Sequence, residues 1–420
     1  MANYDFKSLE PEIAKFWEGR DIYGKIKKRN SGNEKFYYLD GPPYTTGKIH
    51  IGHAWGKALR DSVLRYKRMK GFDVWDRPGF DMHGLPIEVK VEQKLGIKNK
   101  QEIEKIGVQK FIEECEKFAL ENLWPMIDDF KRLGVWLDWN DPYMTIRSEY
   151  IEGGWWALSK AHERGLLYLG KKSMTWCPKC ATALAKHELE YEQRKDPSIY
   201  LKFKVAGKNE YLLVWTTTPW TIPFNMAVMA SPKITYVRAR AGDEVWILAK
   251  DLVDEVSAVT KKDLEIIEEF SGDKLEGLAY EYPFSDEIPF QKGREHRVVL
   301  SSEYVSTDAG TGLVHCAPGC GPEDFEVGRR EGLPPFNETD EHGVFSDEMG
   351  PLSGLKAKDD DEKFIQLLED KGVLLARKNI VHDYPHCWRS KDPVIYRATD
   401  QWFLATQKLR DEMVKQNEKV

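Results

Sequence analysis

The sequence predicts an α/β fold of more than one domain, in which an alternating strand and helix part is followed by a β-rich part. Three observations support this prediction. The chain has 420 residues, which is too long for one ordinary hydrophobic core. Strand and helix patterns alternate up to about residue 195, as is typical of a parallel sheet. Short β-rich runs separated by Gly, Pro, Asn and Asp then follow, a spacing typical of a β-barrel-like domain.

The elements of the first part follow from hydrophobic periodicity and from helix stop signals. Gly134 and Gly165 are expected to end two helices, because glycine readily adopts the left-handed conformation that follows a helix. Ser148 is expected to cap the second of these helices. In chain order the predicted elements are helix and turn at 1–35, with an apolar face of Leu9, Ile13, Phe16 and Trp17, a strand at 36–39, a helix at 54–68, a turn at 76–90, a helix at 109–132 and a helix at 148–164.

The second part is predicted to be an inserted β domain. Its predicted strands are 199–205, 211–215, 235–240, 245–249, 298–301 and 312–316. A helix at 361–370 follows, with Gly372 as its stop, and the chain then enters a motif-rich segment at 381–403. We therefore divide the chain into 1–194, 195–378 as the insertion, and 379–420 as a return segment.

Composition limits the class of protein. Hydrophobic residues make up 41% of the chain and charged residues 31%, as in a soluble globular protein. The sequence shows neither a signal-peptide pattern at its start nor an apolar run of about 18 residues, so we expect no membrane association. Six cysteines, two of them in a Cys-X-X-Cys pair, suit a reducing cytoplasm. The net charge of −7 argues against a general nucleic-acid coat, although local basic patches can hold RNA. We expect a cytoplasmic monomer.

The run from Leu39 to Ala54 is the most specific pattern in the chain. His50 and His53 lie three residues apart on one face of a helix N-terminus, where free N–H groups and the helix dipole attract phosphate. Two imidazoles there suit the charge that develops on a triphosphate during displacement at its α-phosphorus. Alone, such a pair would indicate only a solvated corner between strand and helix. The surrounding run, with a glycine at Gly52 that lets backbone approach a ligand, favours the phosphate site.

His50-Ile-Gly-His53, preceded by Asp40-Gly-Pro-Pro-Tyr44, resembles the first signature of the class I aminoacyl-tRNA synthetases, in the branch that acts on isoleucine, valine and leucine. This resemblance implies the first half of a Rossmann-type nucleotide-binding domain, interrupted by an inserted editing domain. It also implies ATP and Mg²⁺ as cofactors, with the nucleotide at His50, Gly52 and His53.

A second motif, Pro78-Gly-Phe-Asp-Met-His-Gly-Leu-Pro-Ile-Glu88, extends the resemblance. By this match Asp81 would bind the α-ammonium of the amino acid, and Gly41 and Pro42 would form backbone walls around it. Alone, Asp81 would indicate a turn or a helix cap. The residues after Asp81 favour isoleucine and tRNA(Ile) as substrates, with valine and leucine as the alternatives within the family. Phe80 replaces the tryptophan usual in the family, which is a conservative change.

Editing is expected because an isoleucine pocket cannot strongly exclude valine. One methylene is worth only about 1–3 kcal/mol, the known limit for this pair of amino acids. Two segments, Trp215–Asn225 and Gly310–Phe325, resemble the family's editing signatures. By this match Asp324 would anchor the α-ammonium of a misattached valine. The ester end and a water would be held by Thr216, Thr217 and Thr218, and the pocket would be lined by Asn225 and His315. In isolation, a run of threonines would indicate only β-propensity.

The cysteines suggest a zinc site. Cys177 and Cys180 form half of such a site, and Cys387 is a third candidate ligand. Some relatives have a second Cys-X-X-Cys pair here, whereas this chain has Ser390, a poor zinc ligand. His386 or His187 would complete a Cys₃His set. The alternative is a metal-free knuckle with buried thiols.

The family's second signature, a mobile lysine-rich loop, has no counterpart in the sequence. We therefore expect an amino-terminal portion that activates isoleucine poorly but edits by itself. The alternatives are a free-standing hydrolase of valyl-tRNA and a zinc-knuckle RNA-binding module without catalysis. The acidic net charge disfavours the RNA-binding module.

Overall fold

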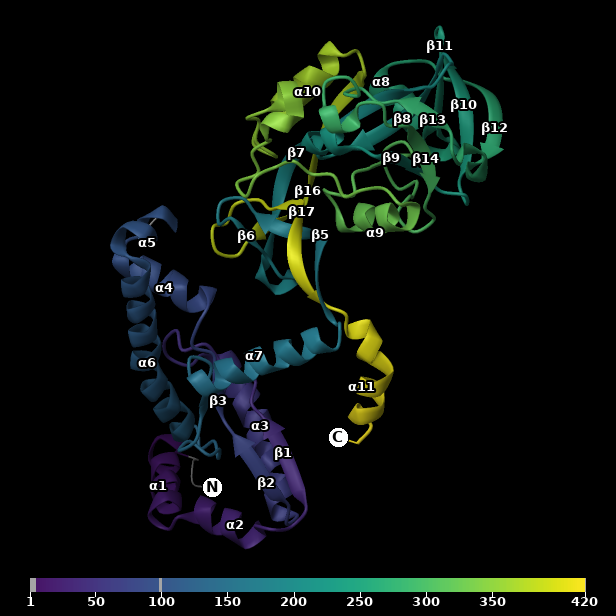
Figure 1. The fold of residues 1–420 in the computed structure, drawn as a ribbon. Helices are drawn as coiled ribbons and strands as arrows, with labels where there is room; N and C mark the ends of the chain where they lie inside the picture. Colours follow the sequence, from purple (N-terminus) through teal and green to yellow (C-terminus); the bar gives the residue numbers. More distant parts are fainter. Residues whose placement is uncertain (1–4, 98–99, 420) are drawn as a thin grey trace. The chain divides into compact units, whose positions relative to one another are not determined.

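The computed structural model describes residues 5–97 and 100–419 and divides into two units, Met1–Leu166 and Leu167–Val420 (Figure 1). Each unit is described by itself. The whole is a mixed α/β fold with one large sheet. Among the described residues, no helix combines the length and the apolar composition needed to cross a bilayer.

The first unit is mainly helical, with two short pairs of parallel strands. β1 and β2 pair in parallel, from Lys35 opposite Asp73 to Leu39 opposite Arg77, and α3 connects them, so this part is a β–α–β unit. The elements of the first unit are α1 (Phe6–Gly19), α2 (Ile22–Asn30), β1 (Lys35–Leu39), α3 (Ile51–Met69), β2 (Asp73–Arg77), β3 (Gly79–Phe80), α4 (Leu85–Leu95), α5 (Lys100–Ile106), α6 (Val108–Arg132), β4 (Tyr143–Met144) and α7 (Ser148–Glu163).

Most predictions for this unit are confirmed. The strand at 36–39 and the helices at 54–68 and 109–132 are present, and Gly134 has a positive φ of +78°. Two predictions need correction. Ser148 is the first residue of α7 and not its cap, because Arg147 occupies that position without a side-chain hydrogen bond. The predicted turn at 76–90 contains the end of β2, all of β3 and the start of α4.

The second unit contains a sheet of ten strands in the order β12-β10-β11-β8-β7-β13-β14-β9-β15, with β16 paired to β7. A three-stranded sheet, β17-β5-β6, completes its β structure. The elements are β5 (Leu167–Cys177), β6 (Thr182–Ala183), β7 (Leu189–Val205), β8 (Glu210–Thr216), η2 (Pro219–Phe224), β9 (Ala227–Ala230), β10 (Thr235–Ala241), β11 (Glu244–Ala249), α8 (Val253–Thr260), β12 (Glu265–Ser271), β13 (Ala279–Glu281), β14 (His296–Leu300), β15 (Val314–Cys316), α9 (Pro322–Glu331), α10 (Asp361–Asp370), β16 (Leu374–Cys387), β17 (Ile395–Leu404) and α11 (Arg410–Asn417).

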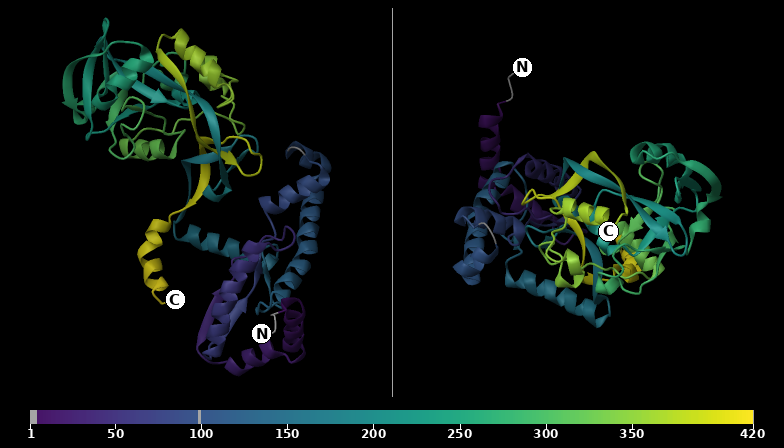
Figure 2. Two further views of the ribbon diagram at one scale, coloured as in Figure 1. Left: turned by 180° about the vertical axis from the view of Figure 1, so that it is seen from behind. Right: turned by 90° about the horizontal axis from the view of Figure 1, so that it is seen from above.

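All six strands predicted for the β-rich part are present, and so is the helix at 361–370. The antiparallel strands β7 and β16 pair from Cys387 opposite Leu189 to Leu374 opposite Leu201, and the large sheet to which they belong is seen from two further sides in Figure 2. The core of this unit is almost completely buried and includes Trp220, Phe224 and Tyr236. The turn η2, which follows the threonine run, is therefore anchored in the core.

Candidate functional site

The two histidines of the first motif cap α3 reciprocally. His50 is the N-cap, and its Nδ1 accepts a hydrogen bond of 3.1 Å from the Gly52 N–H. His53 Nδ1 accepts one of 3.5 Å from the His50 N–H, and the two rings stack with centroids 3.8 Å apart. Because both Nδ1 atoms accept, each neutral ring carries its proton on Nε2, which makes Nε2 the donor. The cap thus orients two N–H donors at a helix N-terminus.

Burial lowers the pKa of His53, and the neighbouring His50 and Lys57 lower it further. His53 is therefore neutral at physiological pH and would offer a hydrogen bond without a full charge. His50 is exposed and His53 is half-buried. The first turn of α3 also exposes apolar side chains, with Ile51 at 83% and Trp55 at 68%.

Asp81 lies beside the loop that follows β1. Its N–H donates to the Pro43 carbonyl at 2.9 Å, and its carbonyl accepts from the Thr45 N–H at 3.2 Å. The structure therefore brings Asp81 next to the segment that contains Gly41 and Pro42. The half-buried Asp81 carboxylate also accepts a bond of 3.3 Å from the Thr145 hydroxyl.

One buried hydrophobic cluster connects β3 and Met82 to the first turn of α3. Phe80 and Met82 are buried with Phe130, and Ile49 packs against the same cluster. The His53 ring meets Phe130 edge-on at 6.4 Å. The loop after β1, the first turn of α3 and the Asp81 segment therefore pack against the same hydrophobic cluster.

Sequence reasoning gave no role to three buried groups in this region. Asp40, 2% exposed, pairs with the buried Lys57 and accepts from the Tyr38 hydroxyl at 2.7 Å. Thr145 Oγ1 accepts from the Met82 N–H at 2.9 Å and lies 2.7 Å from His83 Nδ1. Only Asp40 belongs to a motif, and no spacing rule points to Lys57 or Thr145.

The threonine run of the second unit forms a hydrogen-bonded network. The hydroxyl oxygens of Thr216 and Thr218 are 3.2 Å apart, as are those of Thr218 and Thr221. The Thr221 hydroxyl also lies 3.0 Å from His315 Nε2. This network joins two segments that are 94 residues apart in sequence. Thr221, the connecting residue, belongs to the recognised segment, but no role was expected for it.

The protonation state of His315 follows from these contacts. The Thr221 hydroxyl donates to the Thr218 carbonyl at 2.8 Å, so it accepts from His315 Nε2–H. His315 Nδ1 is then an acceptor, and it has no hydrogen-bond partner among residues 5–97 and 100–419. Burial lowers the pKa of His315 to about 4, so the ring is neutral at physiological pH.

Asp324 lies in the first turn of α9, and its carboxylate accepts a bond of 3.0 Å from the Ala317 N–H. Ala317 follows His315 by two residues, so Asp324 is fixed to the end of the strand that carries His315. Burial raises the pKa of Asp324 to about 7, and Glu323 adds to this effect. The carboxylate is therefore half-ionised near neutral pH.

The other two predicted pocket residues differ in their surroundings. Thr217 is half-buried. Asn225 is completely buried, where its amide donates to the Ala227 carbonyl at 2.8 Å and accepts from the Tyr280 hydroxyl at 2.5 Å. These contacts give Asn225 a role in connecting η2 to the sheet.

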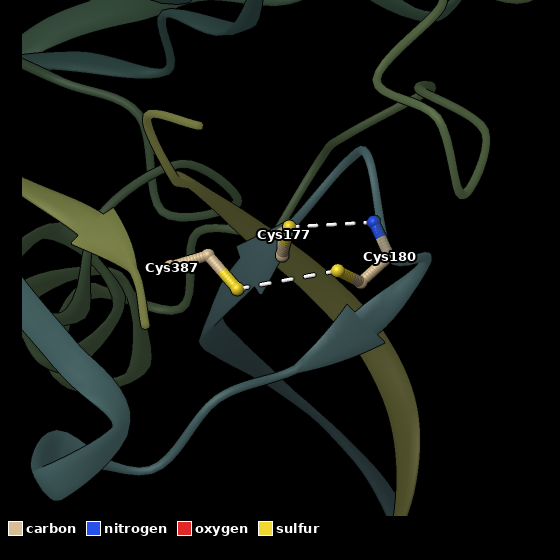
Figure 3. A group of neighbouring side chains, drawn as sticks. All are labelled: Cys177, Cys180 and Cys387. Carbon is tan, nitrogen blue, oxygen red and sulfur yellow. Dashed lines mark hydrogen bonds between the residues drawn. The ribbon is translucent and has the colours of Figure 1, made fainter. Parts of the chain in front are cut away.

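The three predicted cysteine ligands converge, as Figure 3 shows. The Sγ atoms of Cys177, Cys180 and Cys387 all lie within 4.8 Å of one another. The predicted fourth ligand is wrong, because in the described chain this group contains neither His386 nor His187. His386 instead bonds the Tyr384 carbonyl through Nδ1 at 2.9 Å. Ser390 Oγ lies 3.4 Å from Cys177 Sγ.

Comparison with known proteins gives consistent results. Residues 12–420 match the family described as tRNA synthetases class I (I, L, M and V). The chain is 51% identical to the isoleucine–tRNA ligase of Pyrococcus abyssi over 99% of its own length, and 51% identical to that of Archaeoglobus fulgidus over 100%. It spans 40% and 41% of the lengths of these two relatives. A LeuRS structure from Agrobacterium radiobacter in complex with tRNA aligns with 95% of this chain and 50% of its own, at 18% identity and a TM-score of 0.37.

Proposed function

The chain belongs to the class I tRNA synthetases of the I, L, M and V group, and on that premise we propose that it is part of a cytoplasmic isoleucine–tRNA ligase with hydrolytic editing. The substrates would be isoleucine, ATP and tRNA(Ile), and the protein would act as a monomer. The first unit would belong to a Rossmann-type domain, and residues 195–378 would form the editing insertion. The identity to isoleucine–tRNA ligases over nearly the whole chain supports this assignment.

For activation, the isoleucine carboxylate would attack the α-phosphorus of ATP, and pyrophosphate would leave. Asp81 would hold the α-ammonium, while the Nε2–H groups of His50 and His53 would donate to the phosphates. Mg²⁺ would neutralise part of the triphosphate charge. Catalysis here needs only position and charge stabilisation, because the reaction forms no covalent bond to the enzyme.

For editing, a water would add to the ester carbonyl of valyl-tRNA, and the bond to the ribose oxygen would break. The tRNA would leave with a restored hydroxyl and valine as the free acid. Thr216, Thr217 and Thr218 would orient the ester and the water, and Asp324 would hold the α-ammonium. His315 would act as a neutral hydrogen-bonding group, since its pKa of about 4 leaves it uncharged.

The thiol cluster fits zinc in three of four positions. Cys177, Cys180 and Cys387 would provide the ligands, and the tetrahedral geometry of structural zinc sites needs one more. Bound zinc would fix the end of the β7 and β16 ladder, because Cys387 is the last residue of β16.

The hydrogen-bonded path from Thr216 through Thr221 to His315 carries the editing proposal, because it unites both editing segments. The test is hydrolysis of valyl-tRNA(Ile) by this chain, with isoleucyl-tRNA(Ile) as the comparison. We expect faster hydrolysis of the valyl ester. Hydrolysis of both esters at the uncatalysed rate would contradict the proposal.

A free-standing hydrolase is the second candidate. It is favoured by one observation, namely that every residue of the hydrogen-bonded editing network lies in the unit Leu167–Val420. The two candidates are separated by isoleucine-dependent exchange of pyrophosphate into ATP, measured after this chain is joined to the carboxy-terminal part of an isoleucine–tRNA ligase. A hydrolase would show no exchange even in that longer protein.

A further inference from the structure

Outside the residues already discussed, the second unit contains a cluster of buried charges. Asp196, Lys358 and Asp361 are exposed by 2%, 4% and 6%, and we call them the Lys358 cluster. Charged side chains are rarely buried to this extent, because removing each ion from water costs several kcal/mol. The cluster lies next to η2, since α10, which begins at Asp361, packs against η2.

Lys358 is at the centre of the cluster. Its Nζ lies 2.8 Å from Asp196 Oδ2 and 3.7 Å from Asp361 Oδ2, and 4.5 Å from the centre of the Tyr384 ring. The Lys358 backbone has a φ of +68°, a conformation that is unfavourable for a non-glycine residue. The surrounding contacts therefore fix both the backbone and the side chain of this lysine.

Asp196 also contacts two other basic residues. Its carboxylate accepts from Arg194 Nε at 2.9 Å and lies 2.9 Å from His382 Nε2. Burial alone would raise the pKa of Asp196, but Lys358, His382 and Arg194 lower it below its ordinary value. Asp196 is therefore a permanent anion that holds the Lys358 ammonium in place.

Asp361 connects this cluster to η2, because the backbone N–H of Trp220 lies close enough to its carboxylate to oppose the rise in the pKa of that group, while the Asp361 Oδ1 has no hydrogen-bond partner in the described part of the chain. The first N–H groups of a helical turn lack partners within the turn. In η2, Pro219 has no N–H, and the Thr221 N–H donates to the Thr218 carbonyl at 3.0 Å. The Trp220 N–H is the remaining donor, and the Asp361 carboxylate is its neighbour.

Trp220 lies between Thr218 and Thr221, whose hydroxyls form the path to His315. The position of the Trp220 peptide therefore influences the backbone from which both hydroxyls project. Burial raises the pKa of Asp361 to about 7, with Asp196 adding to the rise and Lys358 opposing it. Lys358 thus opposes the protonation of Asp361, whose charged form is the better acceptor.

We propose that Lys358 and Asp361 are positioning residues for ester hydrolysis, which hold η2 so that the threonine hydroxyls face the ester correctly. This inference rests on the proposed editing function. It assigns no contact with the substrate to either residue, and their effect is transmitted through the Trp220 peptide.

The test is hydrolysis of valyl-tRNA(Ile) by the full chain carrying Asp361→Ala, Asp361→Asn or Lys358→Met. We expect kcat to fall about tenfold or more in Asp361→Ala and Lys358→Met, because small misplacements of reacting groups lower rates by such factors. KM should stay within about twofold, since the tRNA is bound mainly through other contacts. Asp361→Asn keeps an acceptor for the Trp220 N–H and should recover most of the rate. Glu362→Ala, at an exposed neighbour paired with Arg377, is the matched control and should have no effect.

The outcomes separate this inference from the function on which it rests. If the unchanged chain hydrolyses valyl-tRNA but folded Asp361→Ala does so equally fast, the positioning role is overturned and the editing function stands. If the unchanged chain does not hydrolyse valyl-tRNA, the proposed function is overturned together with the inference. Lys358→Met carries the same prediction should Asp361→Ala fail to fold.

Discussion

The two candidate sites differ in how much of their geometry is fixed within the chain. In the first unit, His50 is exposed, and the helix that it caps presents Ile51 and Trp55 to solvent. In the second unit, Thr216 and His315 are each only 6% exposed and belong to one hydrogen-bonded network. Large exposed apolar faces indicate interaction surfaces. The proposed editing groups therefore belong to one buried network, whereas the proposed activation groups lie partly on an exposed surface.

The largest expected effect concerns the buried pair of Lys57 and Asp40 in the first unit. In Lys57→Met the Asp40 carboxylate stays buried without its main cation, so we expect the first unit to lose about 3–5 kcal/mol of stability. Urea unfolding followed by hydrogen exchange in α3 measures this loss, and Lys110→Met on the surface of α6 is the control. A loss below about 1 kcal/mol would show that the Lys57–Asp40 pair contributes less to the stability of the first unit than the structure indicates.

Glycines offer a second contrast between the two regions. Gly312 has a φ of +75°, and a Cβ there would lie 2.3 Å from the Ala249 Cβ. Gly312→Ala should therefore cost about 3 kcal/mol through strain and overpacking and should abolish editing. Gly47 has a φ of +146° with open space around it, so Gly47→Ala should cost only about 1 kcal/mol. Thermal unfolding of the two variants compares them, and equal losses would contradict the difference in packing.

A smaller effect is expected at Asp324. Asp324→Asn keeps an acceptor for the Ala317 N–H but loses the charge that would hold the α-ammonium, so hydrolysis of valyl-tRNA should slow about tenfold, or about 1.4 kcal/mol. With a pKa of about 7, the charged form of Asp324 increases as pH rises from 6 to 8, so the rate should rise over this range. Asp324→Asn should flatten that rise, whereas Glu323→Gln should retain it. An unchanged profile in Asp324→Asn would remove Asp324 from the proposed role.

The sequence predicted the local features of this molecule better than its long-range ones. Strands with alternating or apolar runs were found, whereas β12, Glu265–Ser271, is acidic and mostly exposed and gave no such signal. The motif histidines and threonines were identified because they lie within short characteristic runs. Thr145 and Lys358 contact partners far along the chain, and no local pattern encodes such contacts. The fourth zinc ligand was wrong for the same reason, since proximity in sequence to Cys387 did not bring His386 to the thiols.

The central proposal is that this chain holds its editing groups in an organised site, whereas its activation groups do not form a working site by themselves. It is tested most directly by measuring two reactions in one preparation, hydrolysis of valyl-tRNA(Ile) and isoleucine-dependent exchange of pyrophosphate into ATP. We predict clear hydrolysis with exchange at background. Robust exchange by this polypeptide, or exchange without hydrolysis, would contradict the claim.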